Sequence, residues 1–233
     1  DELYAGLTLD DPAPGRGVHV ALSMVSSADG AVAVDGLSGG LGGEADLRAL
    51  SRLRGANDVS LVGAGTVRDE GYVPLTGSAR RQADRVARGL RHAPRLAIVT
   101  ASGRLAPDLA VFDDRAEPPI VLTSRQADRA ALAAIEDRAE VHVVADGELT
   151  AEVIVSTLVE LGLPRVLLEG GPRLNQLMLA AGRIDEVFMT LAPTLVGGPV
   201  PRIISGADEV ATALELVSVH EHDGDLLLRY RSR

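Results

Sequence analysis

Short apolar runs separated by turn-forming residues recur along this chain. They predict strands at residues 18–25, 58–62, 96–100, 120–123, 141–144, 165–168, 185–191, 214–221 and 225–231. The runs VHVALSMV at 18–25 and RVLL at 165–168 are apolar throughout, which is typical of strands buried on both faces of a parallel sheet. The last two runs flank an Asp-Gly turn and predict a hairpin.

Helical patterns alternate with these runs. We expect helices at residues 44–54, 126–138 and 150–161, a helical turn after Thr66, one helix within the poorly patterned segment 70–93, and a helix from Pro172 to Gly182. The first has acids, including Asp46, in its first turn and arginines in its last, which suits the helix dipole. The helix opened by Pro172 has its apolar residues at a three-and-four spacing that predicts a core-facing stripe. These residues are Leu174, Leu177, Met178 and Ala181.

Alternating strands and helices predict an α/β fold. Its central sheet is expected to be mostly parallel and flanked by helices on both faces, with the C-terminal hairpin adding antiparallel strands. Residues 1–17 are expected to form an N-terminal arm, and residues 18–233 a single domain. In such sheets ligands bind at the carboxyl ends of the strands, which directs attention to the segments that follow the strands.

Glycine-rich or acidic segments follow three of the predicted strands. Gly63-Ala64-Gly65-Thr66 allows close approach of a ligand but lacks the third glycine of a full dinucleotide fingerprint. Glu169-Gly170-Gly171-Pro172 offers free N–H groups before a proline-started helix, where a diphosphate fits. Ser26-Ser27-Ala28-Asp29-Gly30 follows the first strand. Each could be an ordinary turn, but their joint occurrence favours a ligand site.

The amino-acid composition excludes several kinds of catalytic and metal site. The chain has no cysteine, so cysteine nucleophiles, thiolate zinc sites and iron–sulfur clusters are excluded. We expect no metal. Its formal net charge of −10 opposes binding to nucleic acids and anionic membranes. No apolar run is long enough to span a bilayer and no leader-like segment is visible, so a cytoplasmic protein is expected.

Taken in order, the motifs resemble the pyrimidine reductase family of riboflavin biosynthesis. The matching residues are Ser27-Ala28-Asp29-Gly30, Leu53-Arg54, Gly63-Ala64-Gly65-Thr66-Val67, Glu169-Gly170-Gly171-Pro172-Arg173-Leu174, Ile184-Asp185-Glu186, Ala192-Pro193 and Val196-Gly197-Gly198. The resemblance implies a dihydrofolate-reductase-like fold and a homodimer. It also implies NADPH-dependent reduction of a ribosylaminopyrimidine 5′-phosphate, in which ribose becomes ribitol.

The resemblance also implies roles for individual residues. Those implied for the cofactor follow strand ends, and they are Val25, Gly63, Gly65, Thr66, Thr100, Ser102, Arg104, Gly170, Gly171, Pro172, Arg173 and Leu174. Ser38, Arg54 and Glu169 are implied to contact the substrate. Asp29 and Glu169 are the carboxylates expected to assist proton transfer, and we do not choose between them.

The substrate side departs from the family pattern in three places. Ala31 stands where a basic residue is usual. The segment 38–42 lacks the family's tryptophan, and 69–72 reads DEGY where the family has D-D-P. A substrate phosphate could be bound by Arg80, Arg81 or Arg85, or these arginines could lie on a solvated face. The zinc deaminase signature does not occur in the given sequence, so a reductase without a fused deaminase is expected.

Two alternatives stay open. A reductase of the same fold acting on dihydrofolate or a dihydropterin would explain the substrate-side departures. A non-catalytic NADPH-binding module would keep the glycine segments and lose the acids. Because Asp29, Arg54 and Glu169 are all present, we rank the binding module last.

Overall fold

A nine-stranded sheet organises the computed structural model, which describes residues 3–4 and 7–233. The strand order is β5-β4-β3-β2-β6-β1-β7-β9-β8. The strands are β1 (His19–Ser27), β2 (Val59–Gly63), β3 (Arg95–Val99), β4 (Ile120–Ser124), β5 (Glu140–Ala145), β6 (Arg165–Leu168), β7 (Glu186–Ala192), β8 (Leu214–His222) and β9 (Asp225–Ser232). The first seven strands of this order, from β5 to β7, each run parallel to their neighbours. Strand β9 is antiparallel to both β7 and β8. The predicted fold class is therefore confirmed.

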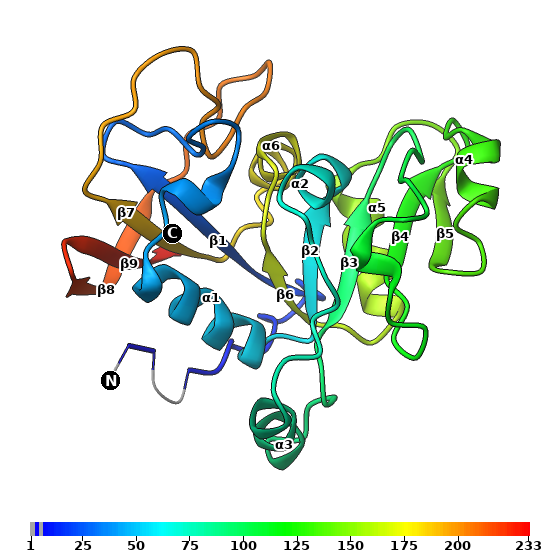
Figure 1. Ribbon diagram of the computed structural model, residues 1–233, viewed down its shortest axis with the longest axis horizontal. Coiled ribbons are helices and arrows are strands. Elements are labelled where there is room, and N and C mark those ends of the chain that lie inside the picture. Colours follow the sequence, from blue (N-terminus) through cyan, green and yellow to red (C-terminus); the bar gives the residue numbers. More distant parts are fainter. Residues whose placement is uncertain (1–2, 5–6) are drawn as a thin grey trace.

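Helices cover both faces of this sheet. They are α1 (Glu44–Ala56), α2 (Ala64–Asp69), α3 (Ala79–Ala87), α4 (Arg129–Ala133), α5 (Ala151–Glu160) and α6 (Pro172–Ala180), with short 3₁₀ turns η1 (Ser38–Gly40) and η2 (Ala110–Phe112). Helix α1 lies across one face near β1 and β6, and α5 lies behind β3 and β4 (Figure 1). No helix in the described part of the chain is long and apolar enough to cross a membrane.

The continuous apolar run of β1 is explained by burial on both faces. Val20 and Leu22 pack into the core formed with α5 and α6. Ala21, between them, packs with α1 and with Phe188 of β7 into a second core. Burying one such aliphatic side chain contributes about 1.5–3 kcal/mol to folding, so β1 fixes the two layers against each other.

One predicted helix is much shorter than expected. Residues 126–138 were expected to be helical throughout, but α4 covers only Arg129–Ala133. The Asp128 carboxylate accepts hydrogen bonds from the N–H groups of Ala130 and Ala131, and this cap starts the helix late. Beyond Ala133 the chain forms turns that insert Ile135 into the core, where its side chain is fully buried.

The N-terminal segment packs on the α1 side of the sheet. Within the predicted N-terminal arm, Tyr4 and Leu9 are buried and Tyr4 contacts the ring of Phe188 edge-on. Between β8 and β9, Asp223 and Gly224 both have positive φ angles, of 52° and 88°. This is the conformation of a type I′ turn, which closes the predicted hairpin.

Candidate active site

A cavity of about 420 Å³ lies between α1 and the carboxyl ends of β1 and β6. Helix α1 lines it with Asp46, Leu50 and Arg54, which share one helix stripe because they are four residues apart. Val25 of β1 and Glu169, directly after β6, form part of the opposite wall. The site is therefore at the sheet edge where the sequence predicted a ligand.

Arg54 and Glu169 form a bidentate ion pair in this cavity. Arg54 Nε donates to Glu169 Oε1 at 2.9 Å, and Arg54 Nη2 donates to Oε2 at 2.6 Å. The hydroxyl of Tyr72 donates to the same Oε2 at 2.6 Å. The guanidinium carbon of Arg54 also lies 5.4 Å from the centroid of the Tyr72 ring. The three side chains thus form one rigid polar cluster, and Tyr72 was not among the predicted site residues.

The charge state of this cluster follows from its contacts. Burial raises the pKa of Glu169, but the hydrogen bonds and the charge of Arg54, with the hydroxyl of Tyr72, outweigh it and hold that pKa below its ordinary value. The pKa of Tyr72 is raised well above its ordinary value by burial and by the Glu169 charge. Glu169 is therefore a carboxylate at neutral pH, and Tyr72 is a neutral hydrogen-bond donor.

The predicted glycine segments meet at the adjacent edge of the sheet. Gly63 N–H donates to the carbonyl of Gly170 at 2.8 Å, which holds the β2–α2 and β6–α6 connections together. A Cβ on Gly171 would lie 2.7 Å from Thr66 Oγ1, and Gly170 has a φ of +89° that side chains disfavour. Any larger residue would fill the space that these backbones enclose. The glycines therefore form a cradle lined by peptide groups.

The amino terminus of α6 opens into this cradle. Its N-cap residue, Gly171, has no side chain to accept from the first N–H groups of the helix, so those of Arg173 and Leu174 keep their capacity to donate. Free N–H groups together with the helix dipole attract an anion. Gly171, Pro172 and Thr66 also line the cavity. The predicted diphosphate position is consequently continuous with the site of Glu169.

The predicted 2′-phosphate segment lies farther along the same edge, after β3. Thr100 is buried and its Oγ1 accepts from Gly103 N–H at 3.1 Å, whereas Ser102 is exposed. Arg104 is 75% exposed and lies 3.5 Å from an Asp128 oxygen. Arg68 of α2 donates to the Arg104 carbonyl at 3.1 Å. Two guanidinium groups thus gather here, and sequence reasoning had named only that of Arg104.

Asp29 lies outside the lining of the cavity. Its carboxylate accepts from Ser27 Oγ at 2.5 Å, from Val196 N–H at 3.1 Å and from Gly197 N–H at 2.7 Å. These bonds, that of Ser27 first, lower the pKa of Asp29 from 3.8 to about 2. The structure thus gives Asp29 a role in tying the loop after β1 to the loop after β7. Its expected part in proton transfer stays a prediction.

Other acids line the cavity that the sequence motifs did not single out. Glu70 Oε1 accepts from the backbone N–H of Ser38 at 2.9 Å, which fixes the predicted substrate residue Ser38 at the cavity wall. Asp46 and Asp69 line the same space. Their spacing within helices α1 and α2 carries no motif, so only the three-dimensional structure brings them together.

The arginines proposed for a substrate phosphate lie elsewhere. Arg85 is 1% exposed and donates to the backbone carbonyls of Arg54, Asn57 and Arg91, so it is structural. Arg80 and Arg81 line a separate cavity between α1 and α3. None of the three is among the residues lining the Glu169 cavity.

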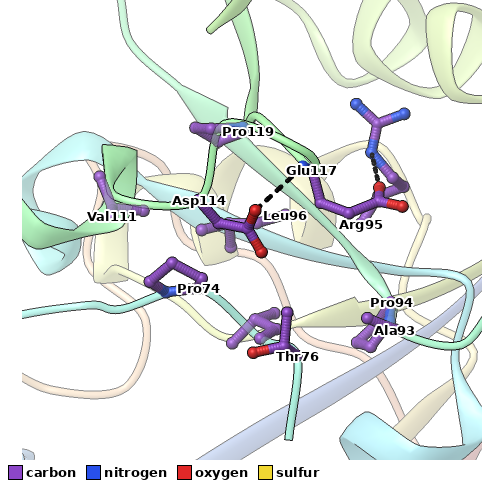
Figure 2. Close-up of a pocket in the computed structure, with 11 residues that line it drawn as sticks. Pro74, Thr76, Ala93, Pro94, Arg95, Leu96, Val111, Asp114, Glu117 and Pro119 are labelled. Carbon is purple, nitrogen blue, oxygen red and sulfur yellow. Dashed lines mark hydrogen bonds and ion pairs between the residues drawn. The ribbon is translucent and has the colours of Figure 1, made fainter. Parts of the chain in front are cut away.

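A further pocket, of about 20 Å³, lies at the opposite edge of the sheet. Figure 2 shows Arg95 at the start of β3 and Pro119 just before β4 in its wall, with Glu117 directed toward Arg95. A volume of this size holds about one water molecule. It is too small for a nucleotide or a sugar phosphate. The Glu169 cavity is the candidate active site because the predicted glycine segments and the Arg54–Glu169 pair meet there.

Comparison with known sequences identifies the family of this chain. The family model for the RibD C-terminal domain matches residues 18–228. The chain is 32% identical over 217 residues to the 2,5-diamino-6-ribosylamino-4(3H)-pyrimidinone 5′-phosphate reductase of Methanothermobacter thermautotrophicus, covering 91% of this chain and 97% of that protein. It is 29% identical to the riboflavin biosynthesis protein RibD of Mycobacterium tuberculosis, covering 92% of this chain and 55% of that longer protein.

Solved structures share the fold. A pyrimidine reductase-like protein from Corynebacterium diphtheriae superposes with a TM-score of 0.83 at 24% identity, covering 100% of this chain and 97% of that one. RibD of Acinetobacter baumannii superposes with a TM-score of 0.77 at 21% identity, covering 94% of this chain and 59% of that one. By its sequence match across 18–228 and its relatives, the chain belongs to the RibD C-terminal domain family of riboflavin-pathway reductases.

Proposed function

We propose that this protein is an NADPH-dependent reductase that converts the ribosyl group of a ribosylaminopyrimidine 5′-phosphate into a ribityl group. The observation that carries the proposal is the continuity between the glycine cradle at α6 and the cavity containing the Arg54–Glu169 pair. The relative from Methanothermobacter is named as a reductase of such a compound, and the match covers 97% of that protein.

The residues present fit NADPH. A diphosphate would bind the N–H groups at the start of α6, in the cradle that a Cβ on Gly171 would fill. Arg104 and Arg68 are suited to a 2′-phosphate, because guanidinium groups pair with phosphate oxygens. The bound cofactor would supply a hydride to an electrophilic carbon of the substrate.

The cavity residues bind and orient the substrate. Arg54 commits Nε and Nη2 to Glu169, which leaves the N–H groups of its Nη1 for a hydroxyl or phosphate oxygen. Glu169, held ionised, fixes the plane of that guanidinium, and Tyr72 fixes Glu169. Leu50 and Val25 supply apolar surface that excludes water from the reacting atoms.

Proton transfer needs a group with a free oxygen. The ribosylamine must open to an imine, and the amine nitrogen must regain a proton after hydride addition. Both oxygens of Glu169 already accept bonds from Arg54 and Tyr72. Asp69, which lines the cavity at the end of α2, is the acid we assign to proton exchange with the substrate.

We further propose that the protein forms a homodimer through β8 and acts in the cytoplasm, where reduced pyridine nucleotide is available. Strand β8 is the last strand at its edge of the described sheet, and it exposes Leu214, Leu216, Val217 and Val219 by 41–53%. An uncovered apolar edge strand favours pairing with another chain.

An NADPH oxidation assay tests the function. Purified protein should oxidise NADPH when given the ribosylaminopyrimidine phosphate, as its 2-amino or its deaminated form, and should leave NADPH unchanged with dihydrofolate. Turnover of dihydrofolate alone would favour the pterin alternative. Tight NADPH binding without turnover of any of these compounds would favour a binding module.

A further inference from the structure

We infer that Asp46 reads the pyrimidine edge of the substrate and selects a 2-amino-4-oxopyrimidine over its 2-oxo counterpart. The inference rests on the proposed function, and it places reduction before any removal of the 2-amino group. The geometry of α1 and of the strands beneath it points to this assignment.

Helix α1 presents three chemically different groups along one stripe of the cavity. Asp46 stands at one end, Leu50 in the middle and Arg54 at the other. The two ends are eight residues apart, or about 12 Å along the helix axis. This is room for a flat ring beside Leu50 with a ribosyl chain extending toward Arg54.

That orientation determines which edge of the ring meets Asp46. The ribosylamino chain leaves from C6 of the pyrimidine, and N3 lies opposite C6 across the ring. With the chain directed toward Arg54, the edge that faces Asp46 contains N3–H and the substituent at C2. A 2-amino group makes this edge a pair of donors, which a carboxylate accepts with both oxygens. A 2-oxo group would place an acceptor against the carboxylate.

Asp46 has the capacity to accept such a pair, and Glu169 does not. Glu169 accepts three hydrogen bonds from Arg54 and Tyr72. Thr190 of β7, the strand residue beside Val25, faces Asp46 as a hydroxyl donor and lowers the pKa of its carboxyl. Thr190 thus orients Asp46 while leaving acceptor sites on the carboxylate.

The surroundings of Asp46 favour incoming N–H donors. Burial raises the pKa of Asp46, the bond from Thr190 lowers it, and the charge of Asp225 raises it, with a net upward shift. The carboxylate is therefore poorly compensated in the free protein. N–H donors from a ligand would stabilise its ionised form, so binding of a 2-aminopyrimidine and ionisation of Asp46 reinforce each other.

The test compares two substrates at mildly alkaline pH: 2,5-diamino-6-ribosylamino-4(3H)-pyrimidinone 5′-phosphate and the same compound with oxygen in place of the 2-amino group. We expect the unmodified protein to favour the 2-amino compound by about 100-fold or more in kcat/KM, because a buried acceptor is left unpaired by the 2-oxo compound. Asp46→Asn should reduce this ratio at least ~10-fold, since an amide can also donate to a 2-oxo group.

Two further variants separate recognition from folding. Thr190→Val keeps Asp46 but frees its rotation, and should lower the ratio several-fold. Glu44→Gln removes an acid from the same helix turn outside this cavity, and should leave the ratio unchanged. A role of Asp46 in folding alone would lower kcat/KM for both compounds equally, and an unchanged ratio in Asp46→Asn would overturn the inference.

A binding measurement keeps this test independent of catalysis. Calorimetry with the free bases 2,5,6-triaminopyrimidin-4-one and 5,6-diaminouracil should show at least ~10-fold tighter binding of the triamino base. If neither phosphate is turned over but this preference holds, the proposed reaction fails and the role of Asp46 stands. Equal affinities, a reversed preference or no binding of either base would overturn it.

Discussion

Arg54 and Glu169, 115 residues apart in sequence, form two parallel hydrogen bonds of 2.9 and 2.6 Å in the candidate active site. Glu169 is almost fully buried, with 3% of its side chain exposed, and Arg54 is 24% exposed. A buried carboxylate needs such a partner to remain ionised. The pair therefore links the stability of the fold to the geometry of the site.

Removing Arg54 should lower the stability of the fold and disturb the geometry of the site. We expect Arg54→Ala to lower the free energy of unfolding by about 3–5 kcal/mol, because Glu169 keeps a buried charge without its partner. Urea unfolding measures this. Arg125→Ala removes an exposed pair with Asp146 and should cost no more than about 0.5 kcal/mol. Equal effects of the two substitutions would contradict the central place given to Arg54.

Filling the glycine cradle should weaken NADPH binding. The new Cβ in Gly171→Ala would lie 2.7 Å from Thr66 Oγ1 and would displace the backbone that binds the diphosphate. We expect the Kd for NADPH to rise at least ~10-fold, or about 1.4 kcal/mol, by fluorescence titration. Gly147→Ala, where a Cβ would meet nothing within 4 Å, is the control. Unchanged affinity in Gly171→Ala would place the diphosphate elsewhere.

The arginines beside the predicted 2′-phosphate position should decide between the two nicotinamide coenzymes. Replacing Arg104 or Arg68 by alanine should raise the KM for NADPH about 10-fold and leave that for NADH unchanged, because only NADPH carries the additional phosphate. Arg125→Ala removes another exposed, ion-paired arginine and should alter neither. A parallel rise for both coenzymes would show that these arginines do not bind the 2′-phosphate.

Asp29 should give the fold an acid-sensitive contribution. Its folded-state pKa of about 2 lies below the ordinary 3.8, so between these values the unfolded chain binds more protons than the folded one. The contribution is present above about pH 4 and is lost as pH falls toward 2. The difference in unfolding free energy between the unmodified protein and Asp29→Asn should be constant near neutrality and shrink below about pH 4. A difference that stays constant down to pH 2 would refute this role.

The exposed apolar edge of β8 should control assembly. Val219→Glu places a charge on a strand whose Val219 side chain is 49% exposed, and should convert the proposed dimer to monomers in sedimentation experiments. Val143→Glu, on β5 at the other end of the sheet and 51% exposed, should not change the mass. A monomeric unmodified protein would remove β8 as an interface.

The alternation of apolar runs and helices was sufficient to predict the strands and the largely parallel sheet. It was not sufficient for the helix at 126–138, because the local cap at Asp128 and the burial of Ile135 override helical propensity there. The glycine cradle was predicted because tight backbone approach requires glycine at particular positions, and sequence motifs record such positions directly.

The polar part of the site could be predicted only in pieces. Arg54 and Glu169 were assigned to the substrate, but their pairing depends on packing α1 over β6, which no local pattern encodes. Tyr72 lies 97 residues before Glu169 and appeared only as a departure from the family motif. Asp46 looked like an acid suited to a helix start. Its position beside Thr190 emerges only when α1 is placed on β7.

The most direct measurement of the proposed reaction follows the hydride itself. NADPH carrying deuterium at the transferred position of C4 should deliver one deuterium to the first carbon of the ribityl chain, detected by NMR and mass spectrometry of the product. Deuterium at that carbon is the result we expect. Deuterium on a heterocyclic ring carbon, or none in any product, would contradict the assignment of this protein as a reductase of the ribosyl group.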